Sequence, residues 1–218
     1  MTTAEGWTQA VRDRLAPGRL LPLGTAADGA LITERAARSV LDGAGAAVRG
    51  VVPGELRIGP ARGPDEEDPE PPPDGLRITA SFGAVTGRPL PELAGELRAA
   101  LLAAAVDGLG LVVAAVDLRV TELFDAPPPA PEPAAARPGP TSPATDDPVA
   151  LLALGVPGVA GITDTLGPPV RRDAAGVRIE VAVTAGGHPL DVARAVRASV
   201  AKASPEDTGV TVVVSGFR

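Results

Sequence analysis

The side chains best suited to acid–base, nucleophilic or metal chemistry are few in this chain of 218 residues. His188 is the only histidine, and there is no cysteine. A catalytic triad needs a nucleophile and an orienting carboxylate around an imidazole, and the sequence has no Gly-x-Ser-x-Gly elbow. The lack of cysteine excludes disulfides, thiolate catalysis and cysteine-ligated zinc or iron–sulfur sites. We interpret His188, which lies between Gly187 and Pro189, as a solvated turn residue, and we predict no catalytic residue.

Two further patterns resemble ligand sites without meeting their requirements. The acidic run from Asp65 to Asp68 lacks the spaced ligands and the glycine of an EF-hand loop. The glycines from Gly43 onward begin like a dinucleotide fingerprint, but Val48 occupies the third glycine position and no predicted strand precedes the turn. We therefore interpret the acidic run as a flexible loop, and we predict no metal and no cofactor.

Five residues form the candidate interaction surface. Trp7, Val11 and Leu15 are spaced as on one side of a short amphipathic helix, which would either pack against the domain or dock on a membrane or a partner. Arg77 and Arg178 lie on the polar face of two predicted strands. They fit either ordinary solubilising positions or a contact surface.

The composition limits the classes of partner that this protein could bind. A formal charge of -7 and an aromatic content of 2% disfavour attraction to nucleic acid and base stacking. The most apolar window, residues 99–116, contains Asp107 flanked by Gly108 and Gly110, and it therefore predicts a helix end followed by a strand, not a membrane span. No targeting segment is visible in residues 1–24, which indicates a cytoplasmic protein.

An internal duplication organises the sequence. The segment Gly-Leu-Arg-Ile at 75–78 recurs as Gly-Val-Arg-Ile at 176–179, and the helical pattern at 93–101 matches that at 192–200. Alternating apolar residues in the first pair predict half-buried strands. Each unit reads as strand, helix, strand, preceded by another helix, for which Thr33 and Asp147 are the predicted N-caps.

These patterns predict an α/β (α+β) fold built of two small related modules, each with one helical layer on a short sheet. We place an N-terminal amphipathic segment at 1–24 and the first domain at 25–123, with an acidic, proline-rich loop at 61–74. A linker rich in proline and alanine follows at 124–147, and a shortened second copy of the domain occupies 148–218.

The first module resembles the alkaline shock protein family, also called the Gls-type general stress family, and the second resembles a degenerate copy of it. The resemblance rests on a shared pattern of glycines, a Pro-led helix and a Val-rich final strand: Gly29, Ile32, Ala36-Ala37, Gly50-Val51, Phe82-Gly83, Pro91 and residues 116–120. It implies a cytoplasmic protein without a known catalytic site. Such a protein is held at the inner face of the cell membrane by a small anchoring partner.

The resulting hypothesis is a non-enzymatic envelope stress response protein that acts through protein–protein contacts, with a membrane-anchoring protein or with itself. It would carry no cofactor and no transmembrane segment. One alternative is a regulatory protein that binds an enzyme of lipid metabolism. Another is a nucleic-acid-binding module, which the acidic charge disfavours.

Overall fold

The computed structural model describes residues 18–61, 75–126, 128, 143–205 and 208–218. The fold is α+β, with 33% of the described residues in helices and 37% in strands. The chain divides into two compact units, which we describe separately. Unit 1 comprises residues 1–36 and 136–218, and unit 2 comprises residues 37–135.

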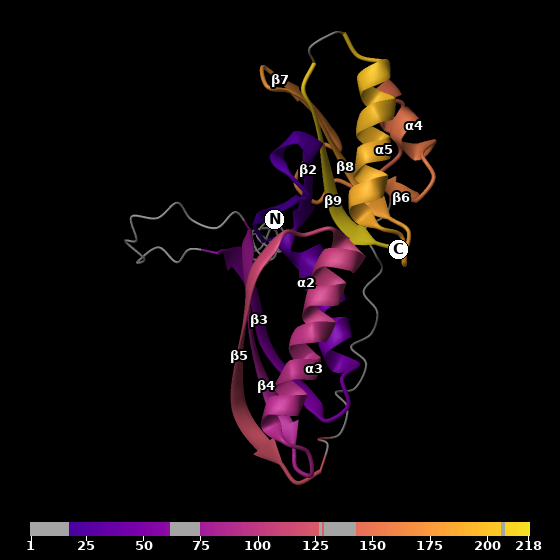
Figure 1. The fold of residues 1–218 in the computed structure, drawn as a ribbon. Coiled ribbons are helices and arrows are strands. Elements are labelled where there is room, and N and C mark those ends of the chain that lie inside the picture. The colour runs from indigo at the N-terminus through magenta and orange to yellow at the C-terminus, as the bar shows by residue number, and fades with distance from the viewer. Residues whose placement is uncertain (1–17, 62–74, 127, 129–142, 206–207) are drawn as a thin grey trace, which may run out of the picture. The chain divides into compact units, whose positions relative to one another are not determined.

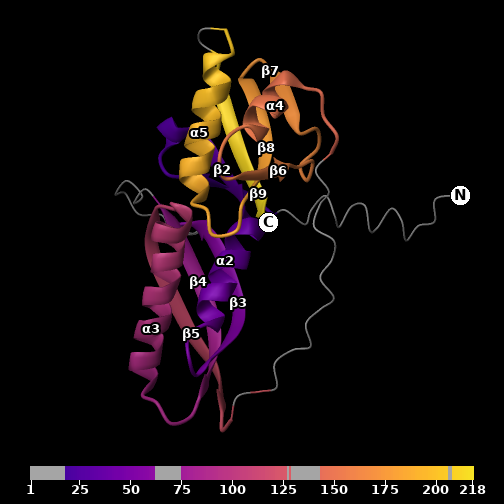
Figure 2. The ribbon, with the colours of Figure 1, turned by 90° about the vertical axis from the view of Figure 1, so that its right-hand side faces the viewer.

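Unit 2 has two helices on one face of a three-stranded sheet (Figures 1 and 2). Its elements follow the order α2 (Glu34–Ala46), β3 (Val51–Pro60), β4 (Leu76–Val85), α3 (Leu90–Ala103) and β5 (Val113–Phe124). The first three residues of α2 are grouped with unit 1. β4 lies in the centre, antiparallel to β3 and parallel to β5.

The core of unit 2 lies between the sheet and its helices. Alternate residues of β4 are buried, as the alternation in the sequence predicts: Leu76, Ile78, Ala80 and Phe82. Leu93, Leu97 and Leu101 of α3 cover them. After α3 the chain makes a π-helical turn, η2 (Ala104–Leu109), and Gly110 ends it with a φ of 80°. The predicted division of residues 99–116 into a helix end and a strand is therefore confirmed.

Unit 1 contains a larger sheet. Its elements are β1 (Leu20–Leu23), η1 (Ala26–Asp28), β2 (Ala30–Thr33), α4 (Pro148–Leu154), β6 (Val159–Ile162), β7 (Val170–Asp173), β8 (Gly176–Val183), α5 (Pro189–Lys202) and β9 (Val210–Phe217). The strand order is β1-β2-β9-β8-β6, and β7 also pairs with β8. Helices α4 and α5 lie on the same face (Figure 2).

The two units share one topology. In each, a helix leads to a strand antiparallel to the next, and a helix then crosses over to a parallel third strand. β3, β4 and β5 therefore correspond to β6, β8 and β9. Backbone details recur as well: Gly50 and Gly158 have φ values of 88° and 91°, and their carbonyls accept equivalent hydrogen bonds from Val85 and Thr184, both of 2.9 Å. The repeat in the sequence thus corresponds to a repeated chain path.

One prediction about the modules is wrong in detail. Each unit has an additional strand, β3 or β6, between its first helix and its central strand. Pro53, Gly54 and Pro60 interrupt the apolar alternation of β3, so this strand has no clear signature in the sequence. The elements of the second copy are shorter: α4 has 7 residues where α2 has 13, and β6, β8 and β9 have 4, 8 and 8 residues where β3, β4 and β5 have 10, 10 and 12.

The predicted boundaries at 24/25 and 123/124 also need correction. Residues 20–33 form β1 and β2, and β2 pairs in parallel with β9, Ala30 opposite Val212. These residues belong to unit 1, because Leu21, Leu23 and Ile32 are buried there. Phe124, assigned to the linker, is the last residue of β5.

Local signals at helix starts are confirmed. The Thr33 hydroxyl accepts a hydrogen bond from the backbone N–H of Ala36 at 3.3 Å, and the Asp147 carboxylate accepts one from Val149. None of the helices in the described part of the chain combines the length and apolar character needed to cross a membrane.

Candidate interaction surface

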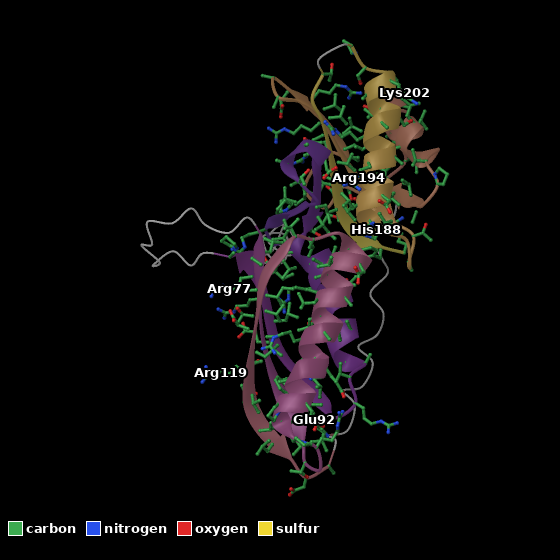
Figure 3. The ribbon with its side chains drawn as sticks, in the orientation of Figure 1. Arg77, Glu92, Arg119, His188, Arg194 and Lys202 are labelled. Atoms are coloured by element: carbon green, nitrogen blue, oxygen red, sulfur yellow. The ribbon has the colours of Figure 1, made fainter. Side chains whose placement is uncertain are left out.

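The face of the unit 2 sheet opposite the helices is polar, and we call it the open face. Arg77 and Arg119 point away from α3 on this side (Figure 3). The strand pairing places its other members beside them: Thr79 opposite Asp117, Arg57 opposite Thr79, and Ser81 opposite Arg119. Arg77, one of the predicted contact residues, therefore belongs to a charged sheet face.

Two ion pairs lie on the open face, one within β3 and one between β4 and β5. Arg57 Nη2 lies 2.8 Å from Glu55 Oε1, and Arg77 Nη1 lies 3.4 Å from Asp117 Oδ2. All four side chains are well exposed, so each pair contributes little to stability. Arg119 makes no ion pair within the described residues.

The outer edge of β5 is the second feature of this surface. β5 pairs with β4 on one side, and no other described strand pairs with it. Its sequence, VAAVDLRVTELF, has neither proline nor glycine over 12 residues. The opposite edge, β3, contains Pro53 and Pro60, and its register shifts between Pro53 and Leu56. Proline and irregular pairing are common protections of edge strands. Only β3 has the prolines, whereas the pairing of β5 with β4 also shifts register, after Leu76 and after Phe82. The two edges of this sheet therefore differ in proline content, and β5 pairs regularly between Ala115 and Val120.

Apolar side chains accompany the exposed edge. Val120 is 38% exposed and Leu123 is 60% exposed. The ring of Phe124 instead turns over Gly83, where a β-carbon would collide with it. The end of β5 thus presents Leu123 outward while Phe124 is held against the sheet.

The corresponding edge in unit 1 is occupied. β9, the counterpart of β5, pairs on its outer side with β2 in parallel, Leu31 opposite Val213 and Ile32 opposite Val214. Val213 is fully buried there. The outer edge of β9 in unit 1 therefore carries a further strand. Among the described residues, the equivalent edge of β5 in unit 2 does not.

Arg178, another predicted contact residue, belongs to the other unit. Arg178 lies in β8 of unit 1, opposite Arg171 of β7 and Thr211 of β9. It occupies the position equivalent to Arg77, but the two residues belong to different units. Trp7, Val11 and Leu15 lie outside the described residues, as does the acidic run at 65–68.

Glu180 is a buried residue that the sequence analysis did not find. Its side chain in β8 is 1% exposed. Oε1 accepts hydrogen bonds from the Thr163 hydroxyl and the Thr165 N–H, both at 2.9 Å, and Oε2 accepts one from the Leu166 N–H at 3.0 Å. The Thr163 hydroxyl also lies 2.6 Å from that of Ser215. This carboxylate holds the loop after β6 against the sheet, and its acceptor sites are used internally.

His188 has a structural place in unit 1. It caps α5, with Nδ1 accepting a hydrogen bond from the Asp191 N–H at 3.4 Å, which agrees with its interpretation as a turn residue. Arg194, which also lies on α5 (Figure 3), donates from Nε to Asp28 Oδ1 at 2.9 Å. That bond, together with hydrogen bonds from Thr25, holds the pKa of Asp28 well below its usual range. The contact ties η1 to α5.

Two cavities among the described residues differ in size and lining. One in unit 2, near Leu41 and Phe82, has a volume of about 20 Å³ and an apolar lining, enough for about one water molecule. A depression of about 270 Å³ lies beside Arg194 and Arg197 in unit 1, but Arg194 binds Asp28 and Arg197 Nη1 donates to the carbonyl of Ala27 at 2.6 Å. Within the described ranges, no group of three or more histidine or acidic side chains could hold a metal ion.

No family model matches this chain, and neither a curated protein nor a solved structure is significantly similar to it. The resemblance to alkaline shock proteins therefore rests on the residues that carry it. The geometry of the open face and of the β5 edge is the remaining guide to function.

Proposed function

We propose that this protein acts by binding another protein chain, which adds a β-strand to the β5 edge of unit 2, and that it is not an enzyme. The observation that carries the proposal is the contrast between β5 and β9. The two strands are topological equivalents, yet only β9 has a strand on its outer side among the described residues.

The chemistry of strand addition explains why this edge would bind. An unpaired strand presents a row of N–H and C=O groups that hydrogen-bond to any extended chain of suitable register. Side chains beside that row then select the partner. Asp117 and Arg119 supply opposite charges on the open face, and Val120 and Leu123 supply apolar surface. A partner strand with complementary charges and apolar residues fits this edge.

The cellular role within this proposal is the envelope stress response, with recruitment to the inner face of the membrane by a small anchoring partner. It is supported by the residues that resemble the alkaline shock family. Two of them lie at this surface: Gly83 accommodates the ring of Phe124, and Asp117 lies on the open face of β5. Other residues of the motif, Gly29 and Ile32 among them, belong to unit 1.

Site-specific photocrosslinking in cells tests the proposal. Leu123 on β5, 60% exposed, is replaced by a photoreactive phenylalanine, and Leu151 on α4, 52% exposed, serves as the matched control. We expect protein adducts from position 123, identified by mass spectrometry, and few from position 151. Equal adducts from both positions, or none from position 123 with and without envelope stress, would contradict binding at β5.

A further inference from the structure

The β5 edge is complementary to itself. Resting on the proposed function, we infer that the chain bound at this edge is a second copy of the protein, with β5 pairing antiparallel to β5 about a two-fold axis through Leu118. The sheet would then run continuously through both copies in the order β3-β4-β5-β5-β4-β3. The inference follows from symmetry and from the spacing of charges on β5.

Symmetry restricts the possible registers. When the same edge is used by both copies, the two strands must be antiparallel, because a parallel arrangement cannot be closed by a two-fold axis. An axis perpendicular to the sheet keeps the helices of both copies on one side. Residues that lie opposite each other in the antiparallel pair must then point to the same face of the sheet. Side chains alternate between the two faces along a strand, so the numbers of two opposite residues are either both odd or both even, and their sum is even.

Charge selects one register from this set. With Leu118 on the axis, Asp117 lies opposite Arg119 of the second copy, and the same pair forms again on the other side of the axis. An axis through Asp117 would place two carboxylates opposite each other, and an axis through Arg119 two guanidinium groups. Like charges directly opposite each other destabilise a sheet. An axis through Val116 or Val120 places neither Asp117 nor Arg119 across from a residue of the other charge.

The existing contacts of these residues are compatible with that register. Arg119 makes no ion pair within the described residues, and Asp117 uses Oδ2 for Arg77, which leaves Oδ1 for the arginine of the second copy. On the helix-covered face, Val120, 38% exposed, would lie opposite the largely buried Val116. Pairing would therefore cover an exposed apolar side chain and give the Arg119 guanidinium an acidic partner.

Cysteine crosslinking tests the register directly, because the chain contains no cysteine. In the Leu118→Cys variant the two thiols meet on the axis, with Cα atoms about 5 Å apart, a separation that permits a disulfide. In the Val120→Cys variant, each thiol lies opposite position 116 of the second copy. The two thiols are therefore four residues apart along the strand direction, which is about 13 Å. We expect mild oxidation of the full-length protein to crosslink Leu118→Cys and the double variant Val116→Cys/Val120→Cys, but not Val120→Cys.

Charge reversal tests the pairing energy. Arg119→Asp puts two acidic side chains opposite each other twice, and we expect it to weaken dimerisation about tenfold or more in sedimentation equilibrium. Arg57→Asp on β3 makes the same change in net charge on the same face and serves as the control. The double variant Asp117→Arg/Arg119→Asp restores opposite charges, and we expect it to recover most of the affinity.

Three outcomes would overturn the inference: a monomeric wild-type protein, equal crosslinking of Leu118→Cys and Val120→Cys, or equal effects of Arg119→Asp and Arg57→Asp. They are distinguishable from failure of the proposed function. A monomer whose photoreactive position 123 captures a different protein keeps the binding edge and refutes self-pairing. A monomer that gives no adduct refutes both.

Discussion

Replacing Glu180 by glutamine tests how the buried carboxylate supports unit 1. Glutamine has nearly the same shape but only one acceptor oxygen. If that oxygen takes the place of Oε1, it keeps the hydrogen bonds from Thr163 and Thr165, and the amide NH₂ then faces the N–H of Leu166. The partly buried N–H of Leu166 then loses its acceptor and meets another donor.

The expected cost follows from these contacts. A buried donor without an acceptor costs about 1–3 kcal/mol, so Glu180→Gln should lower the free energy of unfolding of unit 1 by about that amount. Glu180→Ala removes the acceptors of two backbone N–H groups, and about 2–5 kcal/mol should be lost. Thr163 is less affected, because its hydroxyl still has Ser215 within hydrogen-bonding distance.

Urea unfolding followed by circular dichroism measures the stability, and amide exchange by NMR reports on the loop. We expect faster exchange of the Thr165 and Leu166 amides in both variants, with the larger effect in Glu180→Ala. Thr79→Ala is the control, because Thr79 is the exposed equivalent of Glu180 in unit 2, and it should change stability by about 0.5 kcal/mol or less. Unchanged exchange and stability in Glu180→Gln would refute the role assigned to the carboxylate.

Three further predictions concern local features of the fold. Thr33→Ala removes the acceptor for the Ala36 N–H and should cost about 1 kcal/mol in thermal unfolding, whereas Thr33→Ser should preserve most of that stability. Gly158→Ala places a β-carbon on a residue with a φ of 91° and should cost about 1–3 kcal/mol in urea unfolding. Asp28→Asn weakens the contact with Arg194; since the pKa of Asp28 is lowered in the folded state, its contribution to stability is present above the usual value near 3.8 and is lost as the pH falls further. The difference in urea midpoint between wild type and Asp28→Asn should therefore narrow below about pH 4, and a constant difference down to pH 2 would contradict the pKa shift.

The parts of the fold that were predictable have short-range signals. The alternation of β4 and β8 is local, and so are the caps formed by Thr33 and Asp147 and the helix that begins after His188. Each depends on residues within one or two turns of chain. These features fixed the class of the fold and the presence of a repeat.

The parts that were missed depend on long-range pairing. β2 finds its partner β9 about 180 residues away, and nothing within residues 30–33 specifies that partner. Glu180 occupies the face predicted to be wet, since the preceding Arg178 and the equivalent Thr79 suggest a polar surface. The loop after β6 covers it instead, and a covering loop has no periodic signature.

The divergence of the two units indicates what the open edge is for. Asp117 of β5 stands at the position that Val213 occupies in β9, as the pairing of each with its central strand shows. Val213 is buried beside β2, whereas Asp117 remains exposed and charged. An edge covered permanently by its own chain can carry valine at this position. An edge that is exposed before it binds needs a charge for solubility and for the choice of partner, and in β5 Arg119 supplies the opposite charge two residues away. A chain in which Asp117→Val left both solubility and self-association unchanged would show that this difference between the units has no role in binding.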